Sequence, residues 1–96
     1  MSENSVPRSF EYFLGRACRK FRRGVLDLSA DRMLSQSKYK ASKSYISWFE
    51  NGQVKSTKLI AAYANCDVSQ NKELARLIDE AVASYLDQYV QSVKGR

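Results

Sequence analysis

The chain contains no histidine, one proline, four glycines and two cysteines. Without histidine it lacks the commonest general base of enzymes. Two cysteines alone cannot supply the four ligands of an ordinary zinc site. The sequence also lacks a nucleotide-binding loop and a pair of carboxylates spaced for acid–base chemistry. We therefore expect no enzyme, no cofactor and no metal centre.

Long apolar runs are absent as well. No segment approaches the roughly 20 apolar residues of a membrane-spanning helix. Residues 1–9 contain Glu3 and no apolar stretch of the kind found in signal peptides. We therefore expect a cytoplasmic protein without a membrane partner. In that compartment Cys18 and Cys66, which fall on apolar positions of predicted helices, are expected to be reduced and buried.

Few helix breakers remain among the 96 residues, and the length suits one domain. Apolar residues recur at helical spacing in five segments, which predicts an all-α fold of five helices. We expect a flexible N-terminus over residues 1–8, a four-helix domain over 9–68 and a long last helix within 69–96.

Local signals set the expected helix ends. Gly24 should end a first helix over 10–23, and residues 25–28 should form a linker. Asn51 and Gly52 should end a third helix over 43–50. Residues 35–41 should hold the end of the second helix and a turn. Hydroxyl side chains that can cap the five helices are Ser9, Ser29, Ser42, Ser56 or Thr57, and Ser69.

The predicted third helix has two unlike faces. Tyr45, Ile46 and Phe49 share one side at helical spacing and should point inward. The opposite side is polar except for an indole, and its residues are Lys43, Ser44, Ser47, Trp48 and Asn51. Trp48 has two possible positions, either half-buried against the second or fourth helix, or exposed and available to a ligand.

Positive charge is concentrated in the first two-thirds of the chain. Residues 1–68 carry twelve Lys/Arg and six Asp/Glu, so their net charge equals the whole chain's +6, and residues 69–96 are neutral. The first helix alone contains Arg16, Arg19, Lys20, Arg22 and Arg23. Such clustering favours a polyanionic partner, although a solvated helix face would have the same composition.

Residues 14–64 resemble the Cro/C1-type (XRE-like) helix-turn-helix domains of phage repressors and related bacterial regulators. The most specific part is the run Ser42-x-x-x-Ile-Ser-x-Phe-Glu-Asn-Gly52. The remaining matches are Leu14-Gly15, Cys18-Arg19, Arg22, Leu28-Ser29, Lys55-Ser56-Thr57 and Leu59-Ile60.

The resemblance implies roles for individual residues. Base edges of double-stranded DNA would be read by Lys43, Ser44, Ser47 and Trp48. The DNA backbone would be contacted by Ser42, Asn51, Gln53 and Lys55, with Arg32, Lys38 and Lys40 as further phosphate contacts. Arg22 and Glu50 match a structural ion pair between the first and third helices.

The chain departs from the family pattern in two places. The spacing from Leu28 to Ile46 is longer than in relatives, and Lys40-Ala41 replaces the usual glycine-containing turn. The predicted phosphate contacts of Arg32, Lys38 and Lys40 depend on the conformation of that turn. Ser56 also replaces a proline that relatives commonly have at the start of the fourth helix, where a serine can cap instead.

The last helix has a wide apolar stripe. Its first two turns can pack on the domain, and we expect its last three turns to pair with a second copy, because an exposed stripe of that length favours aggregation. Folding back over the domain's own core is the alternative. The predicted homodimer interface consists of Ala81, Val82, Tyr85, Leu86, Tyr89, Val90 and Val93.

The resemblance therefore implies a homodimeric, sequence-specific DNA-binding protein, a transcriptional repressor of a phage or mobile element that reads its operator with the third helix. The alternative is a protein-interaction module, an antitoxin or enzyme inhibitor, in which the C-terminal helix docks on a second protein.

Overall fold

The computed structural model describes residues 8–94, with side chains described to residue 91. The expected flexible N-terminus lies, except for Arg8, outside the described residues. Residues 8–94 form five α-helices and no strand, which confirms the all-α prediction. The elements are α1 (Phe10–Lys20), the π-helical segment η2 (Phe21–Leu26), α2 (Ala30–Ser37), α3 (Lys43–Glu50), α4 (Leu59–Cys66), the 3₁₀ turn η3 (Val68–Gln70) and α5 (Asn71–Lys94).

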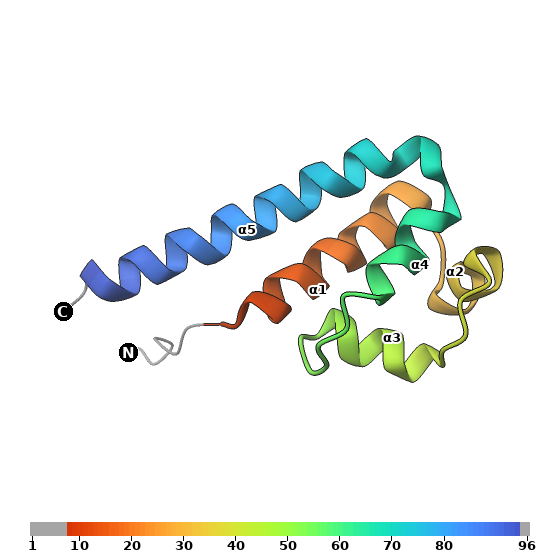
Figure 1. Cartoon of the computed structure of the whole chain (residues 1–96), viewed down its shortest axis with the longest axis horizontal. Helices are drawn as coiled ribbons and strands as arrows, with labels where there is room; N and C mark the ends of the chain where they lie inside the picture. Colours follow the sequence, from red (N-terminus) through yellow and green to blue (C-terminus); the bar gives the residue numbers. More distant parts are fainter. Residues whose placement is uncertain (1–7, 95–96) are drawn as a thin grey trace.

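Helix α1 lies at the centre of the fold. Figure 1 shows α5 running antiparallel along one side of α1, with α3 on its other side and α2 and α4 closing the remaining end. The core lies between η2 and all five helices, and its largest fully buried side chains include Tyr63, Phe21, Phe49, Met33 and Ile46.

Three predicted helix starts are confirmed. The hydroxyl oxygens of Ser9, Ser29 and Ser42 each accept a hydrogen bond from the backbone N–H three residues later, at 3.1–3.2 Å. These bonds satisfy N–H groups that have no partner within the helix. The bounds of α3 agree with the prediction from the sequence, because a serine cap and an Asn-Gly stop enclose it.

The prediction that Gly24 ends the first helix is wrong. The chain continues without a break from α1 through η2, and the turn ends at Asp27, which has a φ of 56°. The N–H groups of both Asp27 and Leu28 bond to the carbonyl of Arg22. This wide turn uses Gly24 as an interior residue, so the linker predicted at 25–28 is reduced to its last residues.

Two other predicted caps also differ. Helix α4 begins at Leu59, after a turn in which the carbonyls of Ser56 and Thr57 accept backbone hydrogen bonds, and no side chain caps it. At the next helix Asp67 takes the role expected of Ser69, because its carboxylate accepts the Ser69 N–H at 3.1 Å. A carboxylate is the stronger acceptor of the two at a helix start.

Helix α5 shares the core of the rest of the chain. Its residues Leu74, Leu77 and Ala81 are buried, and the ring of its Tyr85 packs edge-on to Phe10 of α1 at 5.7 Å between centroids. At the far end the Gln88 side chain exchanges two hydrogen bonds with the backbone of Arg8. The contact of α5 with the rest of the chain therefore extends well past the two turns predicted. Residues before and after position 68 share one core.

No helix within the described residues is long and apolar enough to cross a lipid bilayer.

Helices α1 and α3 approach each other closely at Gly15. A Cβ at this position would lie 2.8 Å from the carbonyl carbon of Glu50 and closer still to the carbonyl oxygen of Phe49. Both neighbours are backbone atoms, which cannot turn aside as a side chain can. Glycine at position 15 therefore sets the distance between the two helices.

We predict that alanine has opposite effects on stability at Gly15 of α1 and at Gly24 of η2. Gly15→Ala should lower the free energy of unfolding by about 1–3 kcal/mol, the usual cost of overpacking. Gly24→Ala, which meets nothing within 4 Å, should raise it by about 0.5–1 kcal/mol because the unfolded chain loses freedom. Urea unfolding of both variants tests this, and equal effects would contradict the proposed close approach.

Candidate nucleic-acid interface

A buried ion pair fixes the end of α3 against η2, which directly follows α1. The Nε and Nη2 atoms of Arg22 donate to the two carboxylate oxygens of Glu50 at 2.8 and 2.9 Å. Arg22 is 7% exposed and Glu50 only 2%. The predicted ion pair is present, in the two-bond geometry that gives arginine its orientational specificity.

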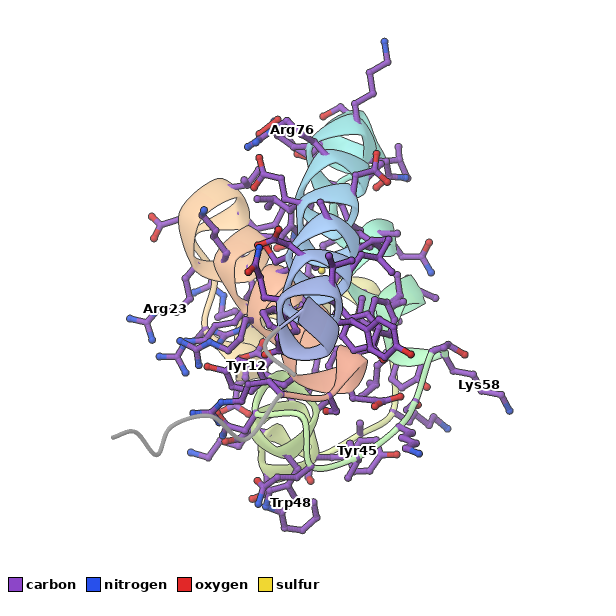
Figure 2. All side chains as sticks on the ribbon, turned by 90° about the vertical axis from the view of Figure 1, so that its left-hand side faces the viewer. Tyr12, Arg23, Tyr45, Trp48, Lys58 and Arg76 are labelled. Atoms are coloured by element: carbon purple, nitrogen blue, oxygen red, sulfur yellow. The ribbon has the colours of Figure 1, made fainter. Side chains whose placement is uncertain are left out.

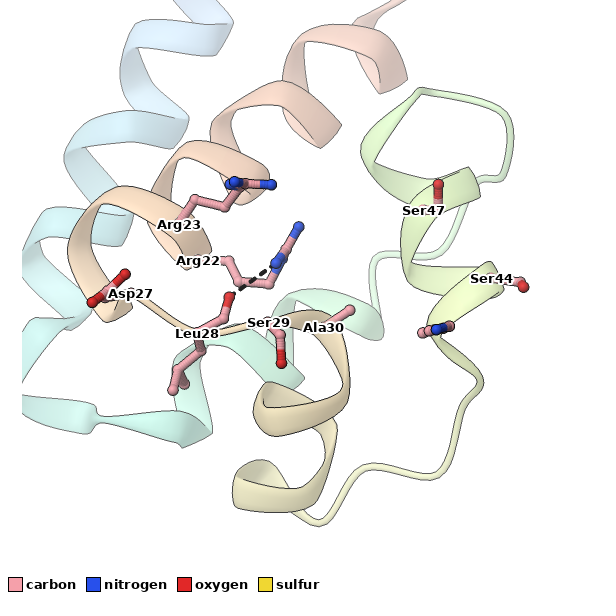
Figure 3. Close-up of a pocket in the computed structure, with 9 residues that line it drawn as sticks. Arg22, Arg23, Asp27, Leu28, Ser29, Ala30, Ser44 and Ser47 are labelled. Atoms are coloured by element: carbon pink, nitrogen blue, oxygen red, sulfur yellow. Dashed lines mark hydrogen bonds between the residues drawn. The ribbon is translucent and has the colours of Figure 1, made fainter.

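Two further bonds extend this pair to the rest of the domain. The Tyr63 hydroxyl of α4 donates to Glu50 at 2.7 Å. The third nitrogen of Arg22, Nη1, donates to the Leu28 carbonyl at 2.9 Å, just before α2 (Figure 3). The network formed by Arg22, Glu50, Tyr63 and the Leu28 carbonyl, here called the buried network, therefore joins η2, α3, α4 and the chain leading into α2.

The buried network also shapes the ionisation of its neighbours. Burial, with the Glu50 carboxylate as the second cause, raises the pKa of the Cys18 thiol to about 12. The same two influences, burial first, raise the pKa of the Tyr63 hydroxyl well above its usual value, so it remains a hydrogen-bond donor. Cys18 is thus a protonated core residue and cannot serve as a nucleophile at neutral pH.

The two faces of α3 are sorted as predicted. Ile46 and Phe49 are buried, and the exposed residues are Lys43, Ser44, Ser47, Trp48 and Asn51. Tyr45 differs from the prediction, because it is only half-buried and contacts Trp48 edge-on at 6.5 Å between ring centroids. Consecutive residues lie about 100° apart around a helix, so Tyr45, next to the buried Ile46, lies at the edge of the inward face.

Trp48 takes the exposed position of the two considered. Its side chain is 49% exposed, and Figure 2 shows it at the end of the molecule opposite Arg76, pointing away from the helices. A large apolar ring in this position loses the free energy that burial would give it, so the surface carries an aromatic group available to a ligand.

A hollow of about 610 Å³, here called the η2–α3 hollow, lies on one side of α3. It brings Lys43, Ser44 and Ser47 together with Arg23 and Ser29 (Figure 3). The complete lining is Arg22, Arg23, Asp27, Leu28, Ser29, Ala30, Lys43, Ser44 and Ser47. Arg23 and Ser29 were not assigned to the site from the sequence, because only the turn of η2 brings them beside α3.

A second hollow of about 670 Å³, here called the α3–α4 hollow, lies at the start of α3. It brings the predicted phosphate contacts Lys40, Ser42 and Lys55 together with Lys58, a cation that sequence reasoning missed. Its lining is Tyr39, Lys40, Ala41, Ser42, Tyr45, Lys55, Ser56, Thr57 and Lys58. In the sequence, Lys58 could have been identified only from its position directly before α4.

The remaining predicted DNA contacts lie on the surface outside the linings of these hollows. Asn51 and Gln53 are exposed in the loop after α3, and the Gln53 N–H bonds back to the Trp48 carbonyl at 2.8 Å. Arg32 is exposed on the first turn of α2, and Lys38 ends that helix with a φ of 61°. The structure thus holds the loop against α3, whereas Arg32 on α2 and Lys38 at its end are exposed and line neither hollow.

The predicted dimer interface is only partly available. Val82, Leu86, Tyr89 and Val90 are exposed on α5, whereas Val93 lies outside the residues with described side chains. Ala81 is buried and Tyr85 half-buried against α1. The assignment of Ala81 and Tyr85 to a free interface is therefore corrected: α1 occupies the side of the helix that they share.

Comparisons of the chain with protein-family models, curated proteins and solved structures find no match.

The chemistry of the surface can be read from its side chains. The exposed polar and aromatic groups on α3 and in the two hollows are ammonium, guanidinium, hydroxyl, amide and aromatic groups, with one carboxylate at Asp27. Within the described residues no three His, Cys, Asp or Glu side chains gather closely enough to hold a metal ion. These groups donate hydrogen bonds and attract negative charge, which are the means by which proteins bind phosphates and base edges.

We predict that removing one member of the buried ion pair is worse than replacing both. Glu50→Ala should lower the free energy of unfolding by about 3–5 kcal/mol, because Arg22 is left charged and buried. The double variant Arg22→Met/Glu50→Leu should recover part of that loss. Urea unfolding measures all three proteins, and a double variant no more stable than Glu50→Ala would contradict the reading of Arg22 as an uncompensated charge.

We also predict that stability falls above pH 9. The unfolded Cys18 thiol ionises near 9.0, whereas the folded thiol keeps its proton to about 12. The folded state then binds more protons than the unfolded state, so the free energy of unfolding decreases with rising pH, by up to about 1.4 kcal/mol per pH unit. Denaturant unfolding under reducing conditions at pH 8, 9 and 10 should show a shallower decrease in Cys18→Ala. Equal slopes would show that Cys18 is not the cause.

Proposed function

We propose that this chain is a sequence-specific, double-stranded DNA-binding protein in which α3 is the recognition helix of a helix-turn-helix. One observation carries the proposal: cationic hollows lie on either side of an α3 face that is polar, exposed and rigidly held. Figure 2 agrees, because Arg23 and Lys58 project to opposite sides of the molecule and Trp48 lies at the end between them.

This arrangement fits the dimensions of B-DNA. The major groove is about 12 Å wide and admits one α-helix, whose diameter with side chains is about 10–12 Å. With α3 in the groove, the two phosphate backbones border it on either side. Arg23 in the η2–α3 hollow would face one backbone. Lys40, Lys55 and Lys58 in the α3–α4 hollow would face the other.

The outer face of α3 carries groups suited to base edges. Lys43 can donate to the O6 and N7 atoms of guanine, and Ser44 and Ser47 can donate to or accept from several bases. The exposed indole of Trp48 suits thymine methyl groups and deoxyribose. Phosphate contacts would supply most of the affinity, and these four side chains would supply the sequence preference.

A homodimer is part of the proposal. The exposed apolar residues Val82, Leu86, Tyr89 and Val90 would pair with their counterparts in a second copy. A two-fold dimer binds a palindromic operator, with half-sites about 34 Å apart or a multiple of that distance. By resemblance to Cro/C1-type domains, the biological role would be transcriptional repression in a phage or mobile element.

The same α5 surface supports a second candidate function, that of an antitoxin or enzyme inhibitor. In this case the four exposed apolar side chains would dock on a different protein and α3 would need no DNA. A stoichiometric protein partner recovered with the chain, combined with no DNA binding at low salt, would favour this alternative.

Selection of bound sequences from random double-stranded DNA, run beside a mass measurement in solution, tests the leading proposal. We expect an enriched motif with two-fold symmetry and the mass of a dimer. Failure to enrich any sequence from the pool would contradict sequence-specific binding. An enriched motif without symmetry, from a monomer, would keep α3 as the reading element and reject the α5 dimer.

We predict that Lys43→Ala/Ser47→Ala abolishes preference for the selected sequence and leaves weak, salt-sensitive binding, because the two hollows keep the cations Arg23, Lys40, Lys55 and Lys58. The matched control is Lys72→Ala/Ser84→Ala, which removes the same two residue types from exposed positions of α5. Competition between selected and random duplexes measures the preference. If the first variant keeps the wild-type preference, the assignment of α3 as recognition helix is wrong.

A further inference from the structure

A second basic surface lies on α1 and η2, away from the tip of α3. A hollow of about 470 Å³ is lined by Arg16, Arg19, Lys20, Arg23 and Gly24. Four of its five lining residues are thus cations, and none is acidic. We call these four cations, Arg16, Arg19, Lys20 and Arg23, the α1 patch.

The spacing of the α1 patch concentrates charge at a cost to the helix. Residues three and four positions apart are neighbours on a helix surface, and like charges in these positions repel. The four cations form four such neighbouring pairs, namely 16–19, 16–20, 19–23 and 20–23. A face selected only for solubility would more simply alternate acids and bases, as Glu73, Arg76 and Glu80 do on α5.

Acidic side chains near the α1 patch do not neutralise it. The ion pairs formed between described residues join Arg22 to Glu50 and Arg76 to Glu73 and Glu80. Glu80 borders a groove shared with Arg16 and Lys20, but its carboxylate bonds to Arg76. Asp27, four residues after Arg23, lines the η2–α3 hollow with it. The patch therefore keeps a large positive charge for a partner.

Arg23 connects the α1 patch to the proposed DNA surface, because it lines both the η2–α3 hollow and the patch. From Arg23 to Arg16 the helix extends about 10 Å at 1.5 Å per residue. One strand of duplex DNA places a phosphate every 3.4 Å along its axis, so this length covers about three phosphates. A continuous cationic surface thus leads from Lys43 across Arg23 to Arg16.

We infer that the α1 patch binds the sugar–phosphate backbone of the same duplex, beyond the bases that α3 reads. This inference rests on the proposed function and extends it. The patch contributes affinity and salt dependence without sequence preference, because phosphates carry no base identity. Its ligand is a duplex longer than the groove segment that α3 occupies.

The test compares two double variants of equal net charge in the full chain. Arg16→Gln/Lys20→Gln removes two cations of the α1 patch that line neither the η2–α3 hollow nor the α3–α4 hollow. Lys72→Gln/Lys94→Gln removes two cations from α5 and leaves Arg76 paired with Glu73 and Glu80, so that no carboxylate is released beside the patch. The probe is a fluorescein-labelled random-sequence duplex, titrated at several salt concentrations between about 50 and 200 mM.

The patch variant should show a dependence of log K on log salt that is shallower by about 2, and binding weaker by roughly 10- to 60-fold near 100 mM, since each lost phosphate contact removes about 0.9 from the slope. The α5 variant should keep nearly the wild-type slope. Thermal unfolding checks that both variants remain folded.

The outcomes separate this inference from the proposed function. If wild type binds the duplex and both variants keep its slope, the α1 patch does not contact DNA, while α3 can still do so. If both variants lose slope equally, net charge alone acts and the patch assignment fails. If wild type does not bind the duplex at low salt, both proposals fail. Polyglutamate serves as a second, acidic probe. If the patch variant loses polyglutamate binding but binds the duplex as wild type does, the patch binds an acidic protein instead of DNA.

Discussion

The Arg22–Glu50 ion pair holds the last turn of α3 against the junction of α1 and η2, and the rest of the site depends on this attachment. Glu50 accepts two bonds from Arg22 and one from Tyr63, so its carboxylate is held from two elements at once. A short helix of eight residues has little stability of its own. The buried network supplies a fixed orientation that the local sequence alone cannot.

This attachment determines which side chains α3 presents. With Glu50, Ile46 and Phe49 facing inward, the helix must point Lys43, Ser44, Ser47 and Trp48 outward. Gly15 allows the two helices to approach closely enough for the ion pair to form. The η2 turn then directs the Leu28 carbonyl to Arg22 and places Arg23 and Ser29 beside α3. Core geometry and surface chemistry are therefore coupled through a few contacts.

The parts of the fold predicted from the sequence are those set by local signals. Ser42 and Asn51-Gly52 define α3 because capping and stopping act over three or four residues. The η2 segment was missed because Gly24 alone resembles an ordinary helix stop, and because the Arg22 side chain that bonds to the Leu28 carbonyl is positioned by Glu50, 28 residues away. The extent of α5 packing was underestimated for a similar reason, since its partners Phe10 and Phe13 lie far away in sequence. Arg23 and Lys58 could be assigned to the site only from the arrangement of the helices, which brings them beside the residues of α3.

The single tryptophan offers the most direct test of the account, because Trp48 is the sole indole and lies on the proposed DNA-binding face of α3. Titration with duplex DNA at low salt should quench or shift its fluorescence emission, and added salt should reverse the change. A parallel anisotropy measurement on labelled DNA shows whether the duplex is bound. Bound DNA with unchanged Trp48 emission would contradict the claim that α3 enters the groove.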